Sequence, residues 1–190
     1  MKKITTPLNK NIIKSLKAGD EVLLSGIIYT ARDQAHKKIV ELIKNNKKMP
    51  FDLNGQVIYY CGPTATPKGK VIGSCGPTTA NRMDGFVEPL LKTGVIAMIG
   101  KGGRARFVKD IIRKYKAIYF IAPSGCGALL AKKVLSKKLV GFKYLGPEAI
   151  YELQVKDFPL VVAIDSKGND IYGKKGQGAR VRGQERKEKR

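Results

Sequence analysis

The stretch VIAMIGKGGRARFVKDIIRKYKAIYFIAPSG, residues 95–125, decides the fold class. It begins with a short apolar run that ends in a glycine-rich turn, at 95–103, and it closes with a second such run at 117–125. Between the two runs lies a helical pattern with one apolar stripe, formed by Phe107, Val108, Ile111 and Ile112. A strand, a helix and a strand in succession predict an α/β fold with parallel strands, because a crossover helix joins parallel neighbours.

The same alternation continues on both sides of this stretch. Apolar runs typical of buried strands occur at 56–62, 139–146 and 158–165. GALLAKKVL, residues 127–135, predicts a further helix, and another helical pattern follows Arg32 with apolar residues at Ala35, Ile39, Leu42 and Ile43. We therefore expect a largely parallel sheet core.

The N-terminal segment AGDEVLLSGIIYTARD, residues 18–33, has a different pattern. It contains two strand-like runs that are broken at Ser25 and Gly26, and no helical pattern lies between them. This arrangement predicts an added β layer ahead of the alternating part.

Composition indicates one folded domain over residues 1–172, followed by a basic tail over 173–190. Hydrophobic residues make up 43% of the chain, which is typical of a globular protein, but almost none occur after Lys167. No apolar run approaches the roughly 20 residues that span a bilayer. The opening MKKITTPLNKNIIKSLKAGDE lacks the apolar segment of a secretory signal, so we expect a cytoplasmic protein.

The formal net charge is +22, from 37 basic and 15 acidic residues. Three interpretations fit such a surplus: lysines that cover solvated helix faces, a nucleic-acid partner, or attraction of small anions. Lysines cluster on the helical patterns, as in AHKKIVELIKNNKK and FVKDIIRKYK, which favours the first interpretation. The alternative of a basic nucleic-acid-binding protein stays open, although no nucleic-acid-binding motif occurs.

The chain contains three cysteines, Cys61, Cys75 and Cys126, and one histidine. An odd number of distant cysteines does not make a disulfide framework, and this inventory does not favour zinc. Three thiolates could in principle hold a [4Fe–4S] cluster, but cluster ligands usually include a close pair. Small residues that fill tight turns are the favoured interpretation, so we predict no metal ligand in this chain.

Four polar residues follow the ends of predicted strands: Arg32, Thr78, Arg82 and Lys101. Ligands of open α/β sheets bind where strands end and helices begin, and helix N-termini favour anions. Two guanidinium groups and an ammonium group could hold a dicarboxylate, since arginine binds carboxylates through paired N–H groups. Each residue alone could equally be a solvated side chain or a turn residue, and their convergence is what indicates a site.

The segment YYCGPTATPKGKVIGSCGPTTANRMDGF, residues 59–86, repeats a Cys-Gly-Pro-Thr turn. Together with YTARDQAHKK, MIGKGG and GPEAIYELQVKDFPLVVAIDSKGNDIY, it resembles the β subunit of class I, iron–sulfur-dependent fumarate hydratases and L(+)-tartrate dehydratases. The resemblance covers residues 8–172 and excludes the basic tail. Where this chain has its cysteines, the family tolerates Ala, Ser or Gly, which supports their interpretation as turn residues.

The resemblance implies a swivelling β/β/α domain and an obligate α subunit, in an α2β2 assembly, that carries the [4Fe–4S] cluster. It implies substrate-binding roles for Arg32, Arg82 and Lys101, and it places the proposed catalytic base at Thr78. The implied reaction is the reversible hydration of fumarate to L-malate, with L(+)-tartrate dehydration as the alternative.

Overall fold

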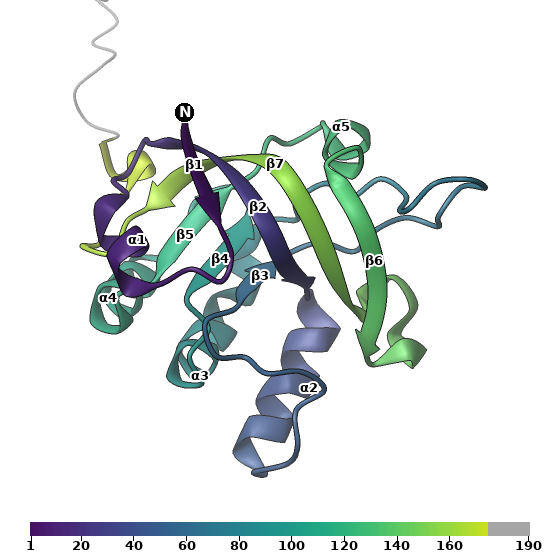
Figure 1. Cartoon of the computed structure of the whole chain (residues 1–190). Coiled ribbons are helices and arrows are strands. Elements are labelled where there is room, and N and C mark those ends of the chain that lie inside the picture. Colours follow the sequence, from purple (N-terminus) through teal and green to yellow (C-terminus); the bar gives the residue numbers. More distant parts are fainter. Residues whose placement is uncertain (175–190) are drawn as a thin grey trace, which may run out of the picture.

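The computed structural model describes residues 1–174 of the chain. It shows one α/β domain, with a seven-stranded mixed sheet and short helices (Figure 1). The elements in chain order are β1 (Lys2–Thr5), α1 (Lys10–Ser15), β2 (Glu21–Thr30), α2 (Asp33–Lys44), β3 (Val57–Tyr59), the 3-10 helix η1 (Ala80–Phe86), α3 (Val87–Lys92), β4 (Ala97–Gly100), α4 (Arg106–Tyr115), β5 (Ile118–Ile121), α5 (Gly127–Ala131), β6 (Val134–Gly141), η2 (Lys143–Glu148), β7 (Ile150–Ile164) and η3 (Ile171–Lys174).

The sheet closes on itself to form a partly barrel-like structure. Strands β1 to β5 pair in parallel in chain order, which agrees with the predicted parallel core. The long strand β7 runs antiparallel to both β2 and β5, so it closes β2, β3, β4 and β5 into a ring that leaves β1 outside. Strand β6 pairs only with β7 and forms one edge. The carboxyl ends of β2, β3 and β4 therefore lie side by side, and this edge positions the site.

Each face of the sheet buries its own hydrophobic core. Successive residues of β3 point to opposite faces, so Val57 and Tyr59 belong to one core while Ile58 belongs to the other. Helices α2, α3 and α4 cover the second core, on one side of the sheet (Figure 1). Because these strands are buried on both faces, their sequences are continuously apolar and do not alternate between polar and apolar residues.

The predicted break at Ser25 and Gly26 is wrong, because β2 continues through both residues. Gly26 adopts a φ of 105°, and the register with β7 shifts between Leu24 and Gly26. A Cβ atom at this position would overlap Thr6. Glycine here marks a β-bulge and a close approach of Thr6, the residue after β1. In a sequence, a glycine at such a place can be mistaken for the end of a strand.

Three other local predictions need correction. The predicted strand at 139–146 ends at Gly141, and a 3-10 helix follows it. The predicted helix at 127–135 ends at Ala131, since the chain enters β6 three residues later. Phe107 is half exposed, so the buried stripe of α4 consists of Val108 and Ile112 with Ile111 beside them.

The predicted tail begins at residue 173, inside η3, and its residues 175–190 lie outside the part of the chain that the structure describes. Among the helices of residues 1–174, none has the length and apolar character that crossing a bilayer requires.

Candidate active site

A ladder of backbone hydrogen bonds brings Thr78 and Lys101 together. The turn that contains Thr78 lies between the ends of β3 and β4, where the Thr78 N–H donates to the Tyr60 carbonyl at 2.7 Å. The Lys101 N–H donates to the Thr78 carbonyl at 3.1 Å, and the Ala80 N–H donates back to the Lys101 carbonyl at 3.0 Å. The second Cys-Gly-Pro-Thr turn therefore extends the sheet by one bridge at its carboxyl edge.

The hydroxyl of Thr78 is half-buried and has a defined orientation. Its Oγ1 lies 2.9 Å from the Tyr60 carbonyl oxygen, which can only accept, so the hydroxyl donates its proton there. The lone pairs of Oγ1 are then available to accept a hydrogen bond or a proton from a bound molecule.

Arg32 and Arg82 share one carboxylate. The Arg32 Nη2 atom lies 3.7 Å from Asp33 Oδ2, and the Arg82 Nη2 atom lies 3.5 Å from the same oxygen. Arg32 also lies 3.8 Å from Glu148 Oε1. These separations are ion pairs without good hydrogen-bond geometry, so both guanidinium groups keep donors for a ligand. Both side chains stay accessible, with exposed fractions of 25% for Arg32 and 46% for Arg82.

The first Cys-Gly-Pro-Thr turn packs against Arg32. A Cβ atom at Gly62 would come within 2.8 Å of Arg32 Cδ and 3.1 Å of the Pro147 carbonyl oxygen. Glycine at this position leaves the space that the arginine side chain occupies. The equivalent glycine of the second turn, Gly76, instead faces Gly127 at an ordinary contact distance of 3.5 Å. The two turns thus have different neighbours.

His36 fixes the backbone at the start of α2. Its ring is fully buried, and Nδ1 lies 2.8 Å from the Arg32 carbonyl oxygen, so Nδ1 carries the proton and donates. Burial lowers the pKa of His36 to about 4, the positive charge of Arg104 acts in the same direction, and the bond to Arg32 opposes both. The imidazole is therefore neutral near pH 7.

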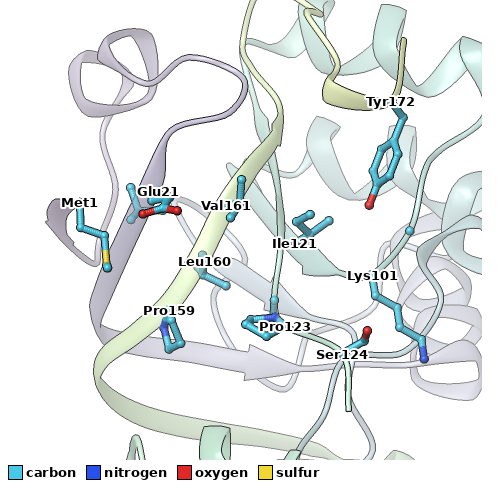
Figure 2. A pocket seen from close by; sticks show the side chains of 13 residues that line it. Met1, Glu21, Lys101, Ile121, Pro123, Ser124, Pro159, Leu160, Val161 and Tyr172 are labelled. Atoms are coloured by element: carbon cyan, nitrogen blue, oxygen red, sulfur yellow. The ribbon is translucent and has the colours of Figure 1, made fainter. Parts of the chain in front are cut away.

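Lys101 also lines a cavity of about 380 Å³. Figure 2 shows Lys101, Ser124 and Tyr172 on one side of this cavity, and Met1 and Glu21 on the other. The remaining walls are mainly apolar and come from β5 and β7. Lys101 thus connects the carboxyl edge of the sheet with a space large enough for a small molecule.

The cysteines do not form a ligand set. Cys61 and Cys75 are buried, and burial raises the pKa of both thiols, that of Cys75 to about 11. Thiols with raised pKa values are poor metal ligands, because the thiolate is the species that binds. Within residues 1–174, no group of three His, Cys, Asp or Glu side chains is placed to hold a metal ion. The residues present do not fit an iron–sulfur cluster held by this chain.

The structure places the four predicted residues as two pairs near the carboxyl ends of the parallel strands, Arg32 with Arg82 and Thr78 with Lys101. Sequence reasoning missed the acidic partners Asp33 and Glu148, together with a buried pair described below. Asp33 directly follows Arg32 at the predicted helix start, so the sequence alone could have indicated that these two side chains lie close together. Glu148 could not have been predicted as a partner, because it lies 114 residues after Gln34, whose N–H donates to it, and no local sequence pattern relates the two.

Comparison with known proteins decides the family. The model of the family described as Fumarase C-terminus matches residues 2–175. The chain belongs to this family. The resemblance deduced from the Cys-Gly-Pro-Thr turns and the Lys-Gly turn is therefore confirmed.

This Fumarase C-terminus chain is similar in sequence to tartrate dehydratase β subunits and to a fumarate hydratase. It is 37% identical over 177 residues to the Escherichia coli L(+)-tartrate dehydratase subunit beta, covering 90% of this chain and 87% of that protein. A Methanocaldococcus jannaschii protein that is provisionally named L(+)-tartrate dehydratase subunit beta is 47% identical, with 87% and 88% covered. Fumarate hydratase 2 of Leishmania major is 39% identical over 82% of this chain, which spans 28% of that protein.

Proposed function

We propose that this chain is the β subunit of a two-subunit, iron–sulfur-dependent hydro-lyase that acts on a four-carbon dicarboxylate. The reversible hydration of fumarate to L-malate is the first candidate reaction. The observation that carries the proposal is the convergence of Arg32 and Arg82 beside Thr78, at one sheet edge of a Fumarase C-terminus chain. Dehydration of L(+)-tartrate is the second candidate, favoured by the names of the relatives of similar length.

The two arginines would bind one substrate carboxylate. Their contacts with Asp33 are longer than hydrogen bonds, so a substrate carboxylate can take paired N–H donors without breaking a strong interaction. Lys101 would supply a third positive charge to the same dianion. Arginine suits this role because its planar fork matches the two carboxylate oxygens.

Thr78 would move the proton at C3. In the dehydration direction, the C3–H bond breaks and its electron pair forms the C2=C3 double bond, while the C2–O bond breaks and hydroxide leaves. The C3 proton and this hydroxide together make up the water that is lost. The alkoxide form of Thr78 would accept that proton, whereas the neutral hydroxyl donates to the Tyr60 carbonyl. A threonine hydroxyl is a weak base, so the surrounding positive charges must favour its deprotonated form.

The partner would be an α subunit that carries the [4Fe–4S] cluster, in an α2β2 assembly in the cytoplasm. When bound, such a cluster supplies a Lewis-acid iron for the substrate hydroxyl. The buried thiols of this chain support the assignment of the cluster to the partner. In this assembly, we propose that the domain is of the swivelling β/β/α type.

The test is an assay of the purified chain, reconstituted with its α subunit and cluster, on fumarate, L-malate and L(+)-tartrate. We expect reversible hydratase activity that requires both chains. Activity with L(+)-tartrate alone would select the second candidate. Inactivity on all three, together with RNA or DNA affinity that falls steeply with salt, would favour a nucleic-acid-binding protein instead.

A further inference from the structure

A buried ion pair lies beneath the proposed site. Arg104 follows β4 and its side chain has no exposed surface. Its Nε atom donates to Asp84 Oδ1 at 2.6 Å, and Asp84 Oδ2 accepts from the Ala105 N–H at 2.9 Å. Because Asp84 belongs to η1, this pair connects the turn after β4 to the helix that carries Arg82.

The guanidinium of Arg104 also contacts two buried tyrosines. Its central carbon lies 4.9 Å from the ring centroid of Tyr119 and 5.4 Å from that of Tyr60. The Nη1 atom donates to the Tyr60 hydroxyl at 3.4 Å, and the Tyr119 hydroxyl donates to the Gly102 carbonyl at 2.9 Å. Cation–π contacts of this kind strengthen when they are shielded from water.

These contacts converge on the residues of the proposed site. Tyr60 provides the carbonyl oxygen that accepts both the N–H and the hydroxyl proton of Thr78. Gly102 directly follows Lys101, and Asp84 lies two residues after Arg82. The Arg104 side chain therefore contacts the helix of Arg82 directly through Asp84, and it is linked to Thr78 through Tyr60 and to the Lys101 turn through Tyr119.

We propose that Arg104, held by Asp84, is a positioning residue that fixes the Thr78 hydroxyl through Tyr60. The inference rests on the proposed hydro-lyase function. Arginine is suited to this role because its rigid fork bonds the carboxylate and the tyrosine hydroxyl while its plane contacts the rings. Lysine keeps the charge and loses that geometry. Burying an ion pair contributes little net stability, which makes a positioning role a sufficient reason for its presence.

The test compares Arg104→Lys with the matched control Arg106→Lys, an exposed arginine two residues further on, in the reconstituted pair. We expect Arg104→Lys to lower kcat by about tenfold or more with KM changed less than about twofold, since small misplacements of catalytic groups are costly. Arg106→Lys should match the unchanged protein. In a Thr78→Ala background, the effect of Arg104→Lys on kcat should nearly disappear, because the two residues act as a unit.

Asp84→Asn provides a second variant, because it keeps the shape and one of the two accepting oxygens but removes the charge. It should lower kcat in the same direction as Arg104→Lys, with the fold retained by circular dichroism. Effects of Arg104→Lys and Thr78→Ala that multiply independently would overturn the proposal, as would an unchanged kcat. Failure of both variants to fold would also overturn it, because the pair would then be structural.

A crystal structure of Arg104→Lys separates this inference from the proposed function. We expect the 2.9 Å contact between Thr78 Oγ1 and the Tyr60 carbonyl to be lost in Arg104→Lys and kept in Arg106→Lys. An inactive unmodified pair would overturn the hydro-lyase function. An intact Thr78 contact in Arg104→Lys would overturn the positioning role, whatever the activity.

Discussion

Asp33 supplies one carboxylate oxygen to both arginines of the proposed site. This arrangement reduces the repulsion between two guanidinium groups and keeps them adjacent. Because neither contact has hydrogen-bond geometry, the pairing orients the arginines without saturating their donors. A substrate carboxylate can form the stronger, paired bonds.

At the residue scale, we predict that Arg82→Lys lowers kcat/KM of the reconstituted pair by about tenfold or more. A charge-assisted hydrogen bond contributes about 1.5–3 kcal/mol, and lysine cannot copy the paired geometry. Steady-state kinetics with L-malate measure the change, and the exposed Arg113→Lys serves as the control. Unchanged kinetics in Arg82→Lys would mean that this arginine is only a solvated surface residue.

Thr78→Ala should behave differently, with a large fall in kcat and little change in KM. The hydroxyl would act in proton transfer and not in binding, so its loss affects the transition state alone. The melting temperature should change little, because the Thr78 N–H keeps its bond to the Tyr60 carbonyl. A rise in KM with an unchanged kcat would contradict the assignment of Thr78 as the base.

At the element scale, the two Cys-Gly-Pro-Thr turns have separate purposes. The second turn presents Thr78, and the first leaves room for Arg32 beside Gly62. We predict that Gly62→Ala displaces the Arg32 side chain and raises KM, with some loss of stability because the added Cβ atom would also crowd the Pro147 backbone carbonyl. Gly76→Ala is the matched control, because its Cβ would meet only an ordinary contact. Equal effects of both changes on KM would contradict this division.

A buried, neutral histidine, His36, lies in the first turn of α2 and predicts a pH dependence of stability. The pKa of His36 is lowered from 6.5 to about 4 by burial, so between these values the unfolded chain binds a proton that the folded chain does not. The free energy of unfolding should therefore be highest above pH 6.5 and fall as the pH decreases toward 4. The shift corresponds to about 3 kcal/mol over that window.

Urea unfolding at a series of pH values measures this dependence. His36 is the only histidine in the sequence, so no other imidazole contributes. His36→Asn, which retains an N–H donor for the Arg32 carbonyl, should be less stable at pH 7 and should show a flatter profile between pH 4 and 6.5. A profile as steep as that of the unchanged protein would show that other groups cause it.

At the scale of the whole molecule, we predict that the isolated chain binds no iron–sulfur cluster. Cys61 and Cys75 are buried with raised pKa values, and within residues 1–174 no three His, Cys, Asp or Glu side chains are placed to hold a metal ion. Treatment with iron and sulfide under reducing conditions should leave the chain colourless, whereas addition of the α subunit should give visible cluster absorbance and activity. Cluster absorbance stoichiometric with this chain alone, and lost in Cys75→Ser, would place the cluster here.

The sequence by itself determined the α/β class, and it predicted the four residues of the proposed site. Both follow from local rules, because hydrophobic periodicity identifies buried strands and parallel strands place their carboxyl ends on one edge. The tertiary structure alone decided that β7 closes the sheet, that Gly26 is a bulge, and that Glu148 reaches the start of α2 at Gln34, 114 residues away. Pairings of this kind depend on how distant segments pack in space. The hydrophobic periodicity of one segment predicts its own secondary structure and does not specify which distant segment it will contact.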